Sequence, residues 1–140
     1  MTPETQTAPD PYTHVWTRIA TGNPAWTLLG IRLGSLEPGR AVLNLSFRPE
    51  ILNPSGNVQG GIVTALADAA GACALYTLLS PDQRVTSIEL KINFLKPVNL
   101  DARAEGRVLH AGSRTGVSYV EVKTADDVVA VGLLTFAVLR

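Results

Sequence analysis

The chain has 140 residues, which is enough for one domain with a substantial core but not for two. Its formal net charge is zero, 46% of its residues are hydrophobic and 17% are charged, so the composition is that of a globular protein and argues against nucleic-acid binding. The single cysteine, Cys73, excludes an intrachain disulfide and offers no set of metal ligands, so we expect no metal and a cytoplasmic location.

The first eleven residues, MTPETQTAPDP, are polar and contain proline, and they predict neither a signal peptide nor a transit peptide. We expect residues 1–25 to form a flexible segment that includes a short helix around residues 12–20. Residues 26–140 are expected to form a single domain.

The domain is predicted to begin with a β-hairpin. Residues 26–36 are rich in large apolar side chains, Glu37-Pro38-Gly39 is typical of a turn, and residues 41–47 alternate in part between apolar and polar. Residues 48–58 are predicted to be a loop.

The most apolar stretch of the chain runs from residue 59 to residue 79 and reads QGGIVTALADAAGACALYTLL. Its length and composition predict a helix, and because apolar residues surround it on nearly all sides, we expect other elements to wrap it. About 20 apolar residues can span a bilayer, but Asp68 in the middle would cost about 2.5–3.5 kcal/mol there, so the pattern favours a buried helix over a membrane span. A buried carboxylate is costly unless it is paired, hydrogen-bonded or used in chemistry, which makes Asp68 the first candidate functional residue.

From residue 84 onward the pattern has a period of two. Thr86, Ile88, Leu90, Ile92 and Phe94 alternate with polar residues, which predicts a strand with one buried face. Three more strands are predicted at residues 102–109, 117–123 and 128–139, separated by turn residues. A hairpin, one long helix and a meander predict an α+β domain in which an antiparallel sheet curls around a single helix.

Two glycines, Gly60 and Gly61, open the predicted helix after the turn-rich run Asn53-Pro54-Ser55-Gly56-Asn57-Val58. The first N–H groups of a helix have no partner within it and can bind an anion or a developing oxyanion. A pair of donors and an acid on one short segment are the parts of an acyl-transfer site, although two glycines also simply allow a tight entry into a helix.

This order of elements, together with three motifs, resembles the hotdog fold and in particular the phenylacetic-acid-degradation (PaaI-like) family of acyl-CoA thioesterases. Asn53 is followed six residues on by Gln59-Gly60-Gly61, and Asp68 lies eight residues after the first glycine. The other motifs are the strand from Thr86 to Lys96-Pro97 and the turn Gly112-Ser113-Arg114-Thr115. The family usually has His where this chain has Gln59, which can donate and accept hydrogen bonds but cannot titrate.

The resemblance implies a role for each matching residue. Asp68 is expected to act as nucleophile or general base on the thioester carbonyl, and the Gly60 N–H to polarise the carbonyl oxygen. Asn53 is expected to position the carbonyl or the water and Gln59 to orient the reacting groups. Ser87, or Thr86 if the strand register differs, is expected to hydrogen-bond the acid.

Each of these residues also has an ordinary structural explanation. Asp68 could be paired with a donor at a subunit contact, Asn53 could form an Asx turn before Pro54, and Ser87 could face solvent. The resemblance also implies contacts with the substrate, from Gly61, Thr86, Lys96 and Arg114. The cations Lys96 and Arg114, together with Arg103, are expected to bind the phosphates of coenzyme A. Any one of these cations can equally be a solvated surface charge.

The resemblance also implies partners. The substrate is expected to be an acyl-CoA with an aromatic or medium-chain acyl group, and no cofactor is expected, since coenzyme A is part of the substrate. The family joins two sheets edge to edge, with the acid from one chain and the glycine donor and Asn from the other, and such dimers pair into tetramers. Two alternative functions remain open. The first is a non-catalytic acyl-CoA-binding protein. The second, a hydratase or dehydratase, is less favoured because no histidine lies in or near the helix.

Overall fold

The computed structural model describes residues 8–140. Short N-terminal helices precede the first strand, and one long helix separates the first two strands from the last four. The elements are α1 (Thr13–Val15), a π-helical turn (Trp16–Ala20), α2 (Pro24–Leu29), β1 (Ile31–Glu37), β2 (Arg40–Leu45), a 3-10 turn (Pro49–Ile51), α3 (Gly60–Tyr76), β3 (Arg84–Phe94), β4 (Ala102–Ala111), β5 (Thr115–Thr124) and β6 (Asp127–Leu139).

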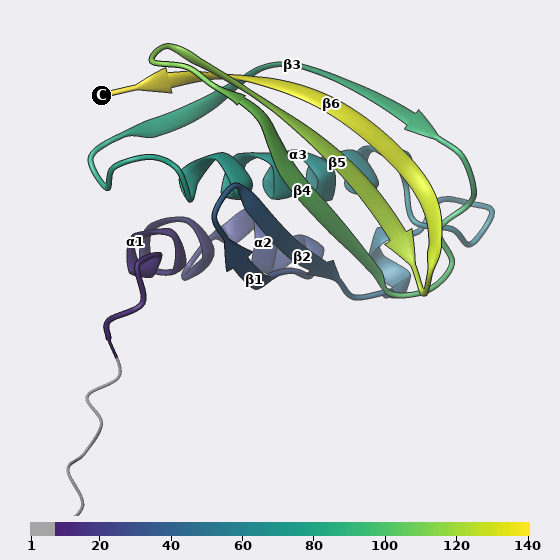
Figure 1. Ribbon diagram of the computed structural model, residues 1–140. Helices are drawn as coiled ribbons and strands as arrows, with labels where there is room; N and C mark the ends of the chain where they lie inside the picture. Colours follow the sequence, from purple (N-terminus) through teal and green to yellow (C-terminus); the bar gives the residue numbers. More distant parts are fainter. Residues whose placement is uncertain (1–7) are drawn as a thin grey trace, which may run out of the picture.

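The six strands form one antiparallel sheet in the order β1-β2-β4-β5-β6-β3. The sheet curls over α3, which runs along its concave side (Figure 1). This arrangement confirms the expected α+β fold with one long central helix. The prediction that the last four strands form a meander was wrong for β3. Only β4, β5 and β6 pair in sequence order, whereas β3 pairs with β6 and forms an edge of the sheet.

Small residues allow α3 to lie close to the sheet. A Cβ atom on Gly106 of β4 would come within 2.6 Å of the Ala70 carbonyl oxygen of α3. At the next residue of α3, the Gly71 carbonyl oxygen accepts a hydrogen bond from the buried Ser118 hydroxyl of β5 at 3.0 Å. The alanine and glycine content of the helix therefore serves close packing of α3 against β4 and β5.

Residues 26–36 do not form one strand, and the prediction of a strand there was wrong. Instead α2 ends at Leu29 and β1 begins at Ile31. The Asn23 side chain caps α2 by accepting from the Trp26 N–H at 3.3 Å, a proline occupies the first turn, and Gly30 ends the helix with φ of 79°. These cap residues outweigh the strand propensity of the apolar residues between them.

The short helix expected around residues 12–20 is confirmed by α1 and the π-helical turn that follows it. Val15 is fully buried, so this segment packs onto the domain. Residues 1–7, part of the segment expected to be flexible, lie outside the described residues. None of the helices in the described part of the chain is long and apolar enough to cross a membrane.

Candidate active site

One stripe of α3 is only half-buried. The sequence predicts a helix that other elements wrap on nearly all sides, and the single chain leaves this stripe uncovered. Ile62, Ala65, Asp68 and Ala72 are half-buried, whereas neighbours such as Leu66 are fully buried. Their spacing of three, three and four residues places them on the same face of the helix. Asp68 therefore lies on an accessible stripe, where solvent can reach its carboxylate.

Asp68 has one hydrogen-bond donor within the described chain. The Ser87 hydroxyl of β3 donates to Asp68 Oδ1 at 2.6 Å. This contact brings together two of the residues singled out from the sequence and decides the register in favour of Ser87 over Thr86. A charge-assisted hydrogen bond of this length holds the carboxylate in one orientation.

A β-bulge between Ser87 and Glu89 makes that contact possible. Ser87 pairs with Phe136, and Leu90 pairs with Leu134; both partners are fully buried, so Ser87 and Leu90 face α3 together. Strict alternation places them on opposite faces, and that prediction was wrong because the bulge inserts an extra residue.

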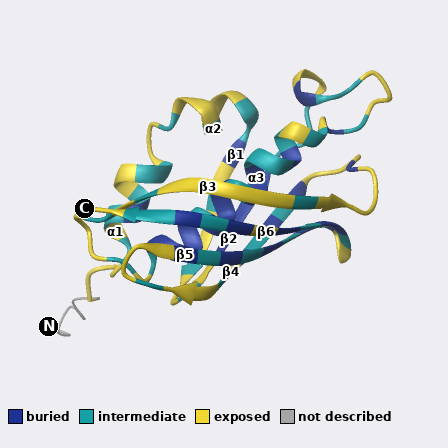
Figure 2. Cartoon of the chain, turned by 90° about the horizontal axis from the view of Figure 1, so that it is seen from above, coloured by how far each residue is buried: buried dark blue, intermediate teal, exposed yellow. Residues whose placement is uncertain are grey.

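The apolar face predicted for β3 is largely exposed in the single chain. Ile88 is 56% exposed, Leu90 40% and Phe94 55%, and Figure 2 shows most of β3 as exposed ribbon. The reason is that β3 pairs on one side only and α3 covers only part of its inner face. An edge strand with exposed apolar side chains is typical of a surface that another chain covers.

Asp68 and Ser87 line a cleft of about 420 Å³ between α2, α3 and β3, which we call the acid cleft. This size is typical of small-molecule sites. Most of its other lining residues are apolar or aromatic, including Ile19, Leu29 and Trp26, and Thr86 also lines it. The buried Tyr76 at its wall accepts a hydrogen bond from the Val85 N–H at 3.0 Å, so its phenol is held in place.

A second cleft of about 380 Å³, the glycine cleft, lies at the start of α3 and is lined by Asn53, Gly60, Phe94 and Lys96 among others. Gln59 precedes the helix without capping it through its side chain. No acceptor within residues 8–140 takes a hydrogen bond from the N–H of Gly60. This donor is therefore free to bind a ligand oxygen.

The Asn53 side chain has a structural role in the loop that precedes α3. Its Oδ1 accepts from the backbone N–H groups of Ser55 at 3.0 Å and Asn57 at 3.2 Å, so it fixes the loop as an Asx turn. Its amide nitrogen donates to no acceptor within the described residues and belongs to a side chain that lines the glycine cleft. The side chain can therefore hold the loop and still offer a donor.

The acid and the glycine donor do not meet within one chain. Gly60 and Asp68 are eight residues apart on α3, which is about 12 Å along the helix axis. No residue lines both the acid cleft and the glycine cleft. A single carbonyl group cannot contact both residues of the same chain.

Most of the remaining predicted site residues are exposed and lie outside the two clefts. Gln59 and Gly61 are exposed and line neither cleft. Lys96 lies at the glycine cleft with its amine 3.6 Å from Asp127, and both side chains are exposed. Arg114 is exposed in the turn between β4 and β5 and lines neither cleft.

Arg103 is occupied on the outer face of the sheet, where it contacts Glu105 at 3.2 Å and the Ala125 carbonyl oxygen at 2.5 Å. Cys73 is fully buried, and burial raises the pKa of its thiol to about 12, so it offers no nucleophile. Sequence reasoning did not single out Trp26 and Tyr76 as site residues. The aromatic residues of α2 and α3 carry no motif that marks them as lining the acid cleft.

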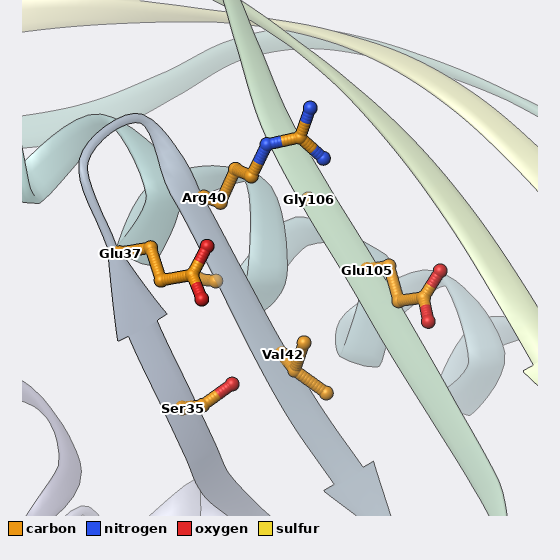
Figure 3. Close-up of a pocket in the computed structure, with 7 residues that line it drawn as sticks. Ser35, Glu37, Arg40, Val42, Glu105 and Gly106 are labelled. Carbon is orange, nitrogen blue, oxygen red and sulfur yellow. The ribbon is translucent and has the colours of Figure 1, made fainter.

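Another depression, of about 240 Å³, lies on the face of the sheet turned away from α3 (Figure 3). Its carboxylates are Glu37, which is exposed, and Glu105, which receives a hydrogen bond from Lys123. The hydrogen bond from Lys123, and to a smaller extent the one from Arg103, holds the pKa of Glu105 below its usual value. These are features of a surface charge network, and none of the residues predicted from the motifs lies there.

Comparison with known proteins connects this geometry to a family. Residues 55–131 match the family model described as the Thioesterase superfamily. The chain is 31% identical to the 1,4-dihydroxy-2-naphthoyl-CoA hydrolase of Listeria monocytogenes over 71% of this chain and 80% of that protein. It is also 31% identical to the acyl-coenzyme A thioesterase PaaI of Escherichia coli over 67% of this chain and 66% of that protein. Among solved structures, a conserved protein of Pseudomonas aeruginosa has a TM-score of 0.81 and 33% identity, covering 83% of this chain and 94% of that one.

Proposed function

Because the chain belongs to the thioesterase superfamily and has the PaaI-like hotdog fold, we propose that it hydrolyses acyl-CoA thioesters to the free acid and coenzyme A. Family membership makes it a thioester hydrolase, and both named relatives act on CoA thioesters. The apolar walls of the acid cleft suit an aromatic or medium-chain acyl group. The proposal includes no metal and no redox cofactor, and coenzyme A enters only as part of the substrate.

The observation that carries this proposal is the hydrogen bond between Ser87 and Asp68 at the wall of an apolar cleft. A carboxylate that is oriented by one donor and accessible from the cleft can act on an electrophile held by the apolar walls. Neither His14 nor His110 lines the acid cleft or the glycine cleft, which disfavours hydratase chemistry.

Asp68 acts in one of two ways. As a nucleophile it attacks the thioester carbonyl, the carbon–sulfur bond breaks, coenzyme A leaves as the thiolate, and water then hydrolyses the acyl-enzyme anhydride. As a general base it takes a proton from a water that attacks the same carbon. In both routes the carbonyl oxygen becomes negative, and the Gly60 N–H at the helix N-terminus stabilises that charge.

Complete sites require two copies of the chain, because the acid cleft and the glycine cleft of one chain are separate. The free edge of β3 offers unpaired backbone groups, and its exposed Ile88, Leu90 and Phe94 offer an apolar surface. Pairing of two β3 edges with twofold symmetry forms a dimer in which each Asp68 meets the Gly60 and Asn53 of the partner. Lys96 then lies at the mouth of the glycine cleft to meet the phosphates of coenzyme A.

The test is the release of free thiol from a panel of acyl-CoAs by the wild-type protein, by Asp68→Asn and by Asp126→Asn. Asp126 is an exposed acid in the turn between β5 and β6 and serves as the matched control. Turnover that is lost only in Asp68→Asn supports the proposal. Binding of acyl-CoA without any turnover by the wild type would favour a binding protein, and equal turnover by Asp68→Asn would remove Asp68 from the mechanism.

A further inference from the structure

The N-terminal helices form two clefts with the rest of the domain. Besides the acid cleft, a second apolar cleft of about 430 Å³, which we call the outer cleft, lies between α2, the π-helical turn and β1. Its lining includes Trp16, Ala20 and Leu33. The outer cleft contains none of the residues assigned to the reaction.

The two clefts share a wall. Trp26 and Ile31 are the residues that line both of them. Ile31 is a buried residue of β1 and belongs to the core, whereas Trp26 is a half-buried residue of α2, a helix that is largely exposed in Figure 2. Trp26 packs against the core from this helix, so it is the more superficial of the two shared wall residues.

The backbone that carries Trp26 is fixed. The Asn23 side chain accepts from the Trp26 N–H at 3.3 Å and donates to the Ile19 carbonyl oxygen at 3.0 Å. The Gly30 N–H donates to the Trp26 carbonyl oxygen at 2.8 Å and closes the helix. With both its N–H and its carbonyl oxygen bonded, the backbone holds Trp26 at the boundary between the two clefts.

We propose that Trp26 sets the acyl specificity by closing the acid cleft against the outer cleft. The inference rests on the proposed function, in which the acyl group lies in the acid cleft beside Asp68. With the indole in place, the cleft accepts acyl groups that fit within about 420 Å³, with an aromatic wall that suits aryl-acyl groups. Without it, the two clefts join and a straight chain can continue into the outer cleft.

The expected size of the change follows from apolar burial. Each additional buried methylene strengthens binding by about fourfold. An acyl chain that reaches the outer cleft with three further methylenes therefore gains on the order of 50-fold over one that ends in the acid cleft. The phenylacetyl group loses its contact with the indole and is used less efficiently.

The experiment compares Trp26→Ala with Trp16→Ala, since Trp16 lines only the outer cleft. The first measurement is kcat/KM for phenylacetyl-CoA and for straight-chain acyl-CoAs of increasing length. We expect Trp26→Ala to shift the ratio of long-chain to phenylacetyl turnover by at least about tenfold, and Trp16→Ala to leave it unchanged. Equal ratios in the wild type and Trp26→Ala would overturn the proposal.

A binding measurement separates this proposal from the proposed function. Non-hydrolysable S-butyl-CoA and S-dodecyl-CoA are titrated calorimetrically into the same three proteins. Tighter binding of the dodecyl ligand by Trp26→Ala supports this proposal even if no protein shows turnover, and an unfolded variant cannot produce such a gain. Unchanged relative binding of the two ligands, or no binding of either, would overturn it.

Discussion

Replacing Gly60 with proline removes the proposed oxyanion donor and should disturb the fold little. Gly60 is the first residue of α3, a position where proline is favoured, and its N–H makes no hydrogen bond to residues 8–140 that could be lost. Gln59 before it has φ of −55° and ψ of 133°, the extended conformation that a residue preceding proline adopts. The variant therefore deletes one N–H and keeps the helix.

The loss of one oxyanion donor typically lowers kcat by about 10²–10³-fold, which corresponds to about 2.7–4 kcal/mol of transition-state stabilisation. We expect Gly60→Pro to lose turnover in this range with little change in KM, because the donor acts on charge that develops only in the transition state. Steady-state kinetics with the best acyl-CoA and a thermal melt of each variant provide the measurement.

Gly60→Ala is the matched control. It keeps the N–H and adds a Cβ atom 3.3 Å from the Phe94 ring, a contact that proline makes as well. We expect the alanine variant to stay close to wild type. Equal losses in both variants would assign the effect to crowding against Phe94, and wild-type turnover in Gly60→Pro would refute the role of the donor.

Three further predictions concern single residues. Ser87→Ala removes the donor 2.6 Å from Asp68 Oδ1 and should lower kcat by about tenfold or more with an unchanged melting temperature; unchanged kcat would make the contact structural only. Ile88→Lys places a charge on the exposed surface of the edge strand β3 and should give a monomer in light scattering, without turnover; an intact, active oligomer would contradict the proposed interface. Lys123 holds the pKa of Glu105 below its ordinary value of 4.5, so ionised Glu105 stabilises the fold above that value and the stabilisation is lost as the pH falls through the folded pKa. Urea unfolding should therefore find Glu105→Gln less stable than wild type at about pH 7, with a difference that shrinks as the pH falls below the ordinary value of 4.5. A difference that does not change with pH would contradict the ion pair.

The sequence predicts the centre of this protein better than its edges. The apolar stretch with Asp68 predicts α3 closely, because length, alanine content and the glycines at its start all agree. The alternation after residue 84 predicts the four strands β3 to β6, but not that β3 pairs with β6 instead of β4. The family resemblance rests on the same segments, and for that reason it predicted the fold correctly.

Features that depend on pairing between distant segments could not be predicted. The bulge that turns Ser87 toward Asp68 depends on the register of β3 against β6, and a local pattern carries no signal for it. The exposure of β3 follows from its place at the sheet edge, which alternation does not reveal. In contrast, α2 could have been found from Asn23, Pro24 and Gly30, whose cap chemistry is local.

The most direct test of the account is complementation between two inactive variants. Asp68→Asn and Gly60→Pro are co-expressed with different affinity tags, and the mixed oligomer is purified through both tags. If the acid of one chain works with the glycine of its partner, each mixed dimer contains one intact site and should have about half of the wild-type activity. A mixed oligomer that is as inactive as either parent would contradict the account, because it would mean that the acid and the donor act within the same chain or do not act together.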